Sequence, residues 1–429
     1  MNMQIDQEVN QKVSRSILER LRSYGPGIIA VLCWLGAGDL VDASLAGAHY
    51  GYSLMWVLAI SLLLRYLIVN VMARYQLCNS DGVSIMEGYA RLHKFYPYFF
   101  LIYAFIMGHL FNSYMIKGAG EALAALLGFG HPFMWSVVVV IAALFILGKS
   151  IYHTLENLMK VSLSLMTIAF LVLAVWSTPD VGQIVKGTIG FGIPEDEGFY
   201  GAFLLIISIT GAVAGSIANF VHPYFMKDKG WVSPVHKKLQ RNDLLFAICV
   251  AIVIDLAVWI VGAEILKPNG IEINDIHDLS KALSLYLGHA GSVIFYLGVF
   301  SILFSSVVGK TSGFPKLLTD ALQLIKKERR IKYGKKLEDD PAFKFFVYFM
   351  LISPIIWSIP GMPGFITLVV GVNALNIIGF PVISVGLLIL SNQKMLGKYR
   401  NNWFENVLLA AATVLAIWSS VKLAMNLFS

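Results

Sequence analysis

Two aspartates interrupt a segment that is otherwise apolar enough to cross a lipid bilayer. Asp39 and Asp42 lie in the stretch 27–48, within the run Gly36-Ala37-Gly38-Asp39-Leu40-Val41-Asp42-Ala43-Ser44. A carboxylate at the centre of a bilayer costs about 2.5–3.5 kcal/mol on insertion scales, so an aspartate there needs a partner or a function. The two residues are three apart, and they share one face if the segment is helical.

A second apolar stretch, 199–226, is interrupted in a similar way by Thr210-Gly211-Ala212-Val213-Ala214-Gly215-Ser216-Ile217-Ala218-Asn219 and then by His222. The two interruptions together offer carboxylate, amide, hydroxyl and carbonyl oxygens and one imidazole. This donor set suits hard or borderline cations such as Mg²⁺, Ca²⁺ or Mn²⁺. Neither interruption contains methionine or cysteine, which argues against a site for soft metals.

The glycines in these segments have two interpretations. Glycine weakens a helix by about 1 kcal/mol relative to alanine, and carbonyls freed at mid-membrane depth are tolerated only where they line a cavity or coordinate something. Small residues also let membrane helices pack closely, without any ligand. The aspartates in the first segment favour the first interpretation.

The composition sets the class of protein. The chain has 429 residues, of which 57% are hydrophobic and 14% charged, with a mean hydropathy of +0.71. A soluble domain is about half apolar and about a quarter charged, so this chain is expected to be an all-α polytopic membrane protein. The net charge of +7 does not indicate nucleic-acid binding, because the basic residues fall between apolar runs.

Apolar runs predict eleven transmembrane helices. They cover about 27–48, 53–77, 97–127, 132–149, 156–177, 199–226, 243–266, 282–310, 342–359, 363–391 and 403–427.

The basic residues then orient the chain. Most lie in the loops around 74–94, 149, 227–241, 326–336 and 394–400, which alternate with loops that carry only a few lysines. The positive-inside rule places the basic loops in the cytoplasm. We therefore expect an integral plasma (inner) membrane protein with a cytoplasmic N-terminus and an outer C-terminus. No cleaved signal peptide is evident at the N-terminus.

The two interrupted helices hold equivalent places in two halves of the chain. Each is followed by four further helices, and interrupted helices at matching positions of two repeats indicate a transporter's binding site. The predicted organisation is a cytoplasmic segment 1–25, a first repeat 26–177, an extracellular loop 178–198, a second inverted repeat 199–391, and helix eleven in 402–429.

Other polar residues lie inside the predicted helices. Arg65 is in the middle of the second helix, where a buried ion pair or a snorkelling side chain is the favoured interpretation over a role in transport. Asp255 in the seventh helix is expected either to pair with Arg65 or to line a vestibule. His109 is interpreted as a hydrogen-bonded interior histidine rather than a ligand.

At the two interruptions the sequence resembles the natural-resistance-associated macrophage protein (Nramp) family of divalent-metal transporters. Further stretches support the resemblance, namely Gly25-Pro26-Gly27, residues 46–54, Ser305-Ser306-Val307-Val308-Gly309 and Leu396-Gly397. The resemblance covers essentially the whole chain. It implies a LeuT-type fold, in which two inverted repeats of five helices carry broken helices 1 and 6, followed here by helix 11.

The chain departs from the family at the motifs that bind metal. The family's Asp-Pro-Gly-Asn falls on residues 36–39, which places glycine at the usual aspartate and Asp39 at the usual asparagine. Its Met-Pro-His falls on residues 215–217, so the methionine thioether is absent. The resemblance implies a site at the same place, at positions that include Gly36, Asp39, Ala212 through its carbonyl, Gly215, Ser216 and Asn373. From the donor set of the two interruptions we expect Asp39 to be the central metal ligand. Asp42, Ser216, Asn219 and Asn373 are expected to assist, directly or through retained water, with Asp42 as a second metal ligand.

The resemblance also bears on proton coupling and the ion pathway. The family's acidic pair in helix 3 aligns with Asn112 and Met115, and the predicted helix 9 contains no arginine. We therefore expect weak or absent proton coupling. The residues expected along the pathway or its gates are His222, Asn112, Arg65 and Asp255.

The predicted function is alternating-access transport of divalent cations such as Mg²⁺ or Mn²⁺. The expected partners are the lipid bilayer and the transported cation, with no cofactor, nucleic acid or obligate protein partner. Two alternatives stay open: the same fold carrying an amino acid or other small organic solute, and an ion sensor that does not transport. An enzyme is not expected, because no HExxH, GxSxG or P-loop pattern occurs.

Overall fold

The computed structural model describes residues 34, 37–147, 152–195, 200–334 and 336–428. Every regular element in these ranges is helical, which confirms the predicted all-α class. The elements are α4 (Ala37–Tyr50), α5 (Met55–Cys78), α6 (Ile85–Leu92), α7 (Phe95–Leu127), α8 (Pro132–Leu147), α9 (Tyr152–Trp176), α10 (Val181–Ile189), α11 (Ala202–Val213), η2 (Ile217–Val221), α12 (His222–Asp228), η3 (Pro234–His236), α13 (Lys237–Val261), η4 (Gly262–Leu266), α14 (Ile276–Ile325), α15 (Lys327–Tyr333), η5 (Leu337–Asp339), α16 (Pro341–Ile352), η6 (Ser353–Ser358), α17 (Phe365–Leu375), η7 (Asn376–Gly379), α18 (Phe380–Ser391), η8 (Lys394–Tyr399) and α19 (Trp403–Phe428).

Eight helices or helix runs among the described residues are long and apolar enough to cross a membrane. A ninth is added if α9 and α10, which meet at an angle of 108°, form one span. The other two predicted segments coincide with α8, which is a shorter apolar helix, and with α4, whose preceding residues lie outside the described ranges. The predicted positions thus coincide with helices, and the total of eleven crossings stays a prediction.

Segment 178–198, expected as a loop, contains α10. Its N-terminus is capped by Asp180, whose carboxylate accepts hydrogen bonds from the N–H groups of Gly182 and Gln183.

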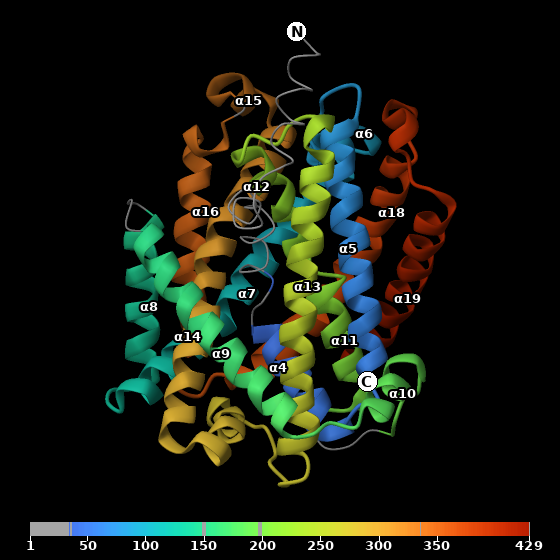
Figure 1. The fold of residues 1–429 in the computed structure, drawn as a ribbon. Helices are drawn as coiled ribbons and strands as arrows, with labels where there is room; N and C mark the ends of the chain where they lie inside the picture. The colour runs from blue at the N-terminus through green and yellow to red at the C-terminus, as the bar shows by residue number, and fades with distance from the viewer. Residues whose placement is uncertain (1–33, 35–36, 148–151, 196–199, 335, 429) are drawn as a thin grey trace, which may run out of the picture.

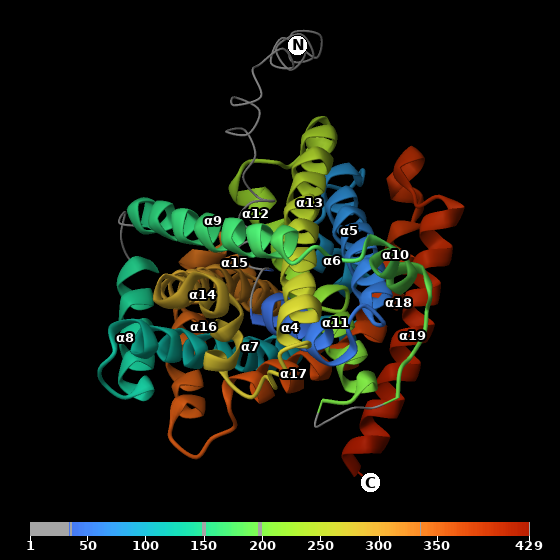
Figure 2. The same cartoon turned by 60° about the horizontal axis from the view of Figure 1, so that its bottom comes forward.

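The helices with interruptions lie in the middle of the molecule. α4 packs against α11, α13 and α17, and α11 also packs against α5. Figures 1 and 2 both show α4 inside the bundle rather than at its rim, with α13 and α11 next to it. Because α4, α11 and α17 are inner helices, polar groups on their facing sides must find partners among one another.

The predicted interruption of the sixth helix is confirmed. α11 ends at Val213, the chain turns extended at Ser216 (φ −64°, ψ 122°), and it continues as the 3₁₀ turn η2 and then α12. Of the interruption predicted over 36–44 in the first helix, Gly36 lies outside the described residues, whereas residues 37–44 form continuous helix in α4. A further interruption was not predicted: α17 and α18 are separated by the 3₁₀ turn η7.

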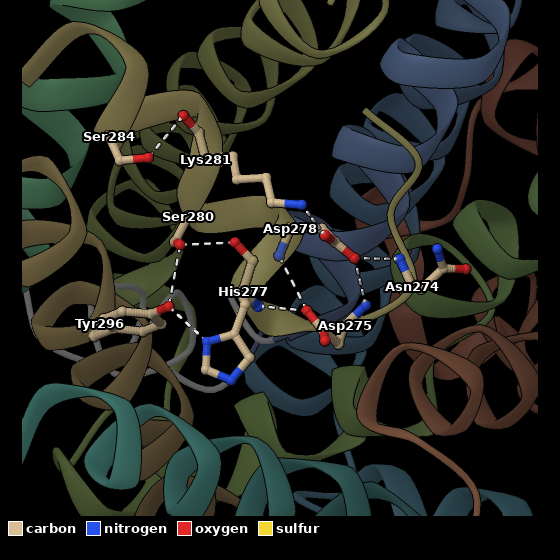
Figure 3. Close-up of polar contacts among 8 residues, drawn as sticks. All are labelled: Asn274, Asp275, His277, Asp278, Ser280, Lys281, Ser284 and Tyr296. Atoms are coloured by element: carbon tan, nitrogen blue, oxygen red, sulfur yellow. Dashed lines mark hydrogen bonds and ion pairs between the residues drawn. The ribbon is translucent and has the colours of Figure 1, made fainter. Parts of the chain in front are cut away.

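The eighth predicted helix has different bounds in the structure. Helical structure begins at Ile276 rather than 282, and it bends back at Gly288, where φ is 57° and ψ is −142°. Figure 3 shows the consequence: His277 and Tyr296 meet, with 2.7 Å between Nδ1 and the hydroxyl oxygen. Nineteen residues of straight helix would separate them by about 28 Å. After this bend α14 continues to Ile325, well past the predicted end at 310.

Candidate functional site

A small internal cavity lies where α4, α5, α7, α11, α14 and α17 meet. About 10 Å³ of it is open to the centre of a water-sized sphere, which is room for about one water molecule. Its lining residues are Trp34, Gly38, Arg65, Phe111, Tyr114, Met115, Ala212, Ser216, Ala218, Lys310 and Asn373. A second cavity of the same size shares Gly38 and Ala212 with the first, and Asp42 lies in its wall.

The Asp42 carboxylate joins three helices. It is 2% exposed and projects from α4. The Ser208 hydroxyl of α11 donates to it, with 2.9 Å to each carboxylate oxygen, and Asn373 Nδ2 of α17 lies 3.1 Å from Oδ2. A buried carboxylate is costly unless it is hydrogen-bonded, and these donors supply hydrogen bonds to both of its oxygens.

Small residues allow these helices to approach one another. A Cβ on Gly38 would lie 2.6 Å from Asn373 Nδ2, and one on Gly211 would lie 2.1 Å from the Asn373 carbonyl oxygen. Gly215 differs, because a Cβ there would meet its nearest neighbours at 3.4 Å, an ordinary contact. The packing interpretation of the glycines therefore holds at Gly38 and Gly211.

The carbonyls released where α11 ends are all hydrogen-bonded. Asn376 Nδ2 donates to the oxygen of Gly211 at 2.8 Å. Arg65 donates from Nη2 to the oxygen of Ala212 at 2.8 Å and from Nε to that of Val213 at 2.9 Å. Asn219 Nδ2 lies 3.2 Å from the oxygens of both Val213 and Ala214. Side chains thus satisfy the last turn of this helix.

Two basic side chains line the cavity. Arg65 is 1% exposed, and its guanidinium lies 5.4 Å from the centre of the Trp34 ring. Lys310 is 3% exposed, and its ammonium lies 5.2 Å from the centre of the Phe111 ring and 3.5 Å from the sulfur of Met115. Both cations therefore face aromatic rings, an arrangement that stabilises desolvated positive charge.

Comparison with known proteins shows which family has this architecture. The family model described as natural resistance-associated macrophage protein-like (Nramp) matches residues 27–426. The chain belongs to the Nramp family. The divalent metal cation transporter MntH of Deinococcus radiodurans is 26% identical over 311 residues, which are 70% of this chain and 69% of that protein. MntH of Bacillus subtilis is 26% identical over 300 residues, 67% of this chain and 68% of that protein.

Solved structures show the same fold. The manganese transporter of Eremococcus coleocola, bound to an aromatic bis-isothiourea substituted compound, has a TM-score of 0.73 at 17% identity and covers 94% of this chain and 87% of its own. MhsT in complex with L-phenylalanine has a TM-score of 0.57 at 14% identity, covering 94% and 97%. The predicted LeuT-type fold is confirmed, and this Nramp-family chain is an integral membrane protein.

The structure brings some of the predicted site residues together. Ala212, Ser216 and Asn373 line the first cavity, and Asp42 lies in the wall of the second. Gly36 and the side chain of Asp39 lie outside the part of the Nramp chain that the structure describes.

Other predicted site residues are not among those that line the two cavities. Asn219 caps the carbonyls at the end of α11. Asn112 donates to the Thr311 hydroxyl and to the Met350 carbonyl, and so joins α7 to α14 and α16. Asp255 is buried on α13. His222 is fully buried beside Trp34, with ring centres 6.1 Å apart and planes at 23°.

Lys310 was not predicted as a site residue. The predicted helix 8 ended at this residue, which placed it at a membrane boundary, whereas α14 continues to Ile325 and buries it. A lysine directly after the apolar run 301–309 was the available signal. Arg65 was expected chiefly as a structural residue, and the structure places it in the cavity wall and against the α11 carbonyls.

Proposed function

We propose that this Nramp-family protein carries divalent cations across the membrane by alternating access. The observation that carries the proposal is the buried Asp42 carboxylate at the junction of α4, α11 and α17, held by Ser208 and Asn373. In a LeuT-type fold, interrupted helices near the middle of the bundle form the substrate site. The names of the relatives, divalent metal cation transporter and manganese transporter, support the same cargo.

The ligands proposed for a hard cation are oxygen atoms from the two interrupted helices and from α17. The proposed set contains the carboxylates of Asp42 and Asp39, the amide oxygen of Asn373 and the hydroxyl of Ser216. Because Mg²⁺ and Mn²⁺ favour carboxylate, carbonyl and water oxygens, either ion suits this set, with retained water completing its shell. No thioether takes part in the proposal, since the position of the family's methionine is Gly215.

Uptake into proteoliposomes tests the proposal. Wild-type protein is expected to take up Mn²⁺ or Mg²⁺. Asp42→Asn is expected to lose about 1.4 kcal/mol of ion binding, which raises Kd about tenfold. At ion concentrations below Kd, its uptake rate should therefore fall by at least about tenfold. Asp39→Ala is expected to act in the same direction. Asp81→Asn is the matched control, because Asp81 lies in a surface loop and pairs with Arg91. Equal uptake by wild type and Asp42→Asn would contradict the proposed site.

Arg65 and Lys310, the two basic side chains in the cavity wall, favour a second candidate function, which is transport of a small organic solute that carries a carboxylate. Two unit charges about 5 Å apart at an effective dielectric constant of about 20 interact by about 3 kcal/mol, and a divalent ion doubles this repulsion. Arg65 and Lys310 would instead attract a carboxylate. A thermal-shift panel separates the candidates: stabilisation by amino acids or carboxylic acids, without stabilisation by Mn²⁺ or Mg²⁺, favours the organic solute.

A sensor that binds ions without moving them is the third possibility, and the same preparations address it. Binding of Mn²⁺ to purified protein, together with uptake no faster than in protein-free liposomes, would support a sensor over a transporter.

A further inference from the structure

The end of α11 is held by a side chain from another helix. Arg65 projects from α5 and donates to two successive carbonyls, those of Ala212 and Val213, at 2.8 and 2.9 Å. The arginine and these carbonyls are 147 and 148 residues apart in the chain. At 1% exposure the guanidinium is almost completely removed from water.

The physical chemistry of a helix end explains this arrangement. The last carbonyls of a helix lack partners within it, and the aligned peptide dipoles concentrate partial negative charge there. A cation at that point is stabilising. Guanidinium is charged at every physiological pH, and its planar fork presents Nε and Nη to two acceptors at once. The Trp34 ring, 5.4 Å from the guanidinium, further stabilises the desolvated charge.

We propose that Arg65 is a resident cation of the α11 break. It occupies the carbonyl oxygens of Ala212 and Val213, so that the break is stable without a bound ion and these oxygens are withheld from the transported cation. Arg65 is therefore a positioning residue that sets which ligands the site can offer. The part of this inference that concerns the transported cation rests on the proposed function, while the part that concerns the stability of the break does not.

A charge-removing variant provides the test. In Arg65→Gln the neutral side chain is shorter and leaves at least one of the two carbonyls without its donor. Mn²⁺ titrated into the purified protein as its chloride is expected to bind at least about tenfold more tightly to Arg65→Gln than to wild type. The variant is also expected to melt at a lower temperature without Mn²⁺, and to gain more thermal stability than wild type when Mn²⁺ is added.

Two further variants separate charge from packing. Arg65→Lys keeps a buried positive charge, so its Mn²⁺ affinity is expected to stay within about threefold of wild type. Arg74→Gln is the matched control: Arg74 is another arginine on α5, mostly buried, and it pairs with Glu405 at 2.9 Å. This control is expected to lose thermal stability with no change in Mn²⁺ affinity.

The results for the Arg65 variants support or overturn the resident-cation role as follows. Unchanged or weaker Mn²⁺ binding in Arg65→Gln, or the same change in Arg74→Gln, would overturn the resident-cation role. If Arg65→Gln is recovered folded only in the presence of Mn²⁺, the ion has replaced the guanidinium and the inference is supported. If Arg65→Gln does not fold in either condition, Arg65→Lys decides: a folded variant with wild-type affinity supports a role of charge, and a variant that also fails to fold overturns it.

A failure of the proposed function would look different. Wild-type liposomes would then take up neither Mn²⁺ nor Mg²⁺, while the lower melting temperature of Arg65→Gln relative to wild type, measured without Mn²⁺, would persist.

Discussion

At the scale of single residues, two glycines in the same interrupted helix have different structural roles. Gly211 and Gly215 lie four apart in the same interrupted helix, and only Gly215 was expected at the binding site. In the structure a Cβ on Gly211 would collide with the Asn373 carbonyl, whereas a Cβ on Gly215 would make ordinary contacts. Gly211 therefore allows α11 and α17 to touch, and that contact places Asn373 beside Asp42.

This difference predicts the result of two alanine substitutions. Gly211→Ala is expected to destabilise the protein by about 1–3 kcal/mol, the usual cost of overpacking a close contact, and to lower cation binding because Asn373 must move. Gly215→Ala is expected to change the free energy of unfolding by less than about 0.5 kcal/mol. Thermal or denaturant unfolding of both variants in detergent measures the difference. Equal stability of the two would show that α11 and α17 have room to separate.

At the scale of elements, ion pairs beyond the end of the predicted helix 8 hold neighbouring helices. Lys316 of α14 pairs with Asp228 of α12 at 2.5 Å and with Glu338 at 2.9 Å. Asp320 accepts a hydrogen bond of 2.9 Å from the Tyr224 hydroxyl, also on α12. The second half of the interrupted sixth helix is thereby fastened to α14, so α12 and α14 are expected to move together during transport.

Asp340, before α16, is a further anchor of this region. It caps α16 by accepting from the Ala342 N–H at 2.9 Å, and it receives hydrogen bonds from Gln323 and Arg329. Burial alone would raise the pKa of its carboxyl, but the hydrogen bonds from Arg329, Ala342 and Gln323 outweigh burial, and the pKa is lowered.

A pH dependence follows from the sign of this shift. Because the folded state lowers the pKa of Asp340, its contribution to stability is complete above the unfolded value, about 3.9, and is lost as the pH falls through the folded pKa. Asp340→Asn is expected to cost about 1–3 kcal/mol at neutral pH. The difference in unfolding free energy between wild type and variant should shrink below about pH 4. A difference that grows with acidity would contradict the assigned cause.

At the scale of the whole molecule, the two positions at which the family resemblance implies an acidic pair hold Asn112 and Met115, which do not titrate. Asn112 bonds to Thr311 and to the Met350 carbonyl, and the sulfur of Met115 lies 3.5 Å from the ammonium of Lys310. The pair expected to be acidic in the family is thus an amide engaged between helices and a thioether. This arrangement supports the proposal of weak or absent proton coupling.

Simultaneous measurement of ion uptake and internal pH tests that proposal. In liposomes that contain a pH-sensitive dye, Mn²⁺ uptake is expected to proceed without acidification beyond that of protein-free liposomes. A proton ionophore added at the end confirms that the dye responds. Acidification that rises in proportion to Mn²⁺ uptake would contradict the proposal and would require another titrating group on the pathway.

Local sequence patterns were sufficient to predict the positions of the helices and the interruption of the sixth helix. Long apolar runs predicted where its helices lie, since burying backbone in lipid requires helices, and the run from Thr210 to Asn219 predicted the break in the sixth. Local patterns could not predict the bend at Gly288, the interruption at η7, or the buried position of Lys310.

Only the tertiary structure decided which polar groups meet. Arg65 bonds to carbonyls 147 and 148 residues away, and Asn373 reaches a carboxylate 331 residues away. Apolar periodicity is a property of neighbouring residues, whereas a buried polar group binds whichever partner the packing of distant helices places within about 3 Å. For that reason the sequence indicated that polar groups lie in the membrane, and the fold determined that the Arg65 guanidinium occupies the Ala212 carbonyl, which was expected to bind the ion.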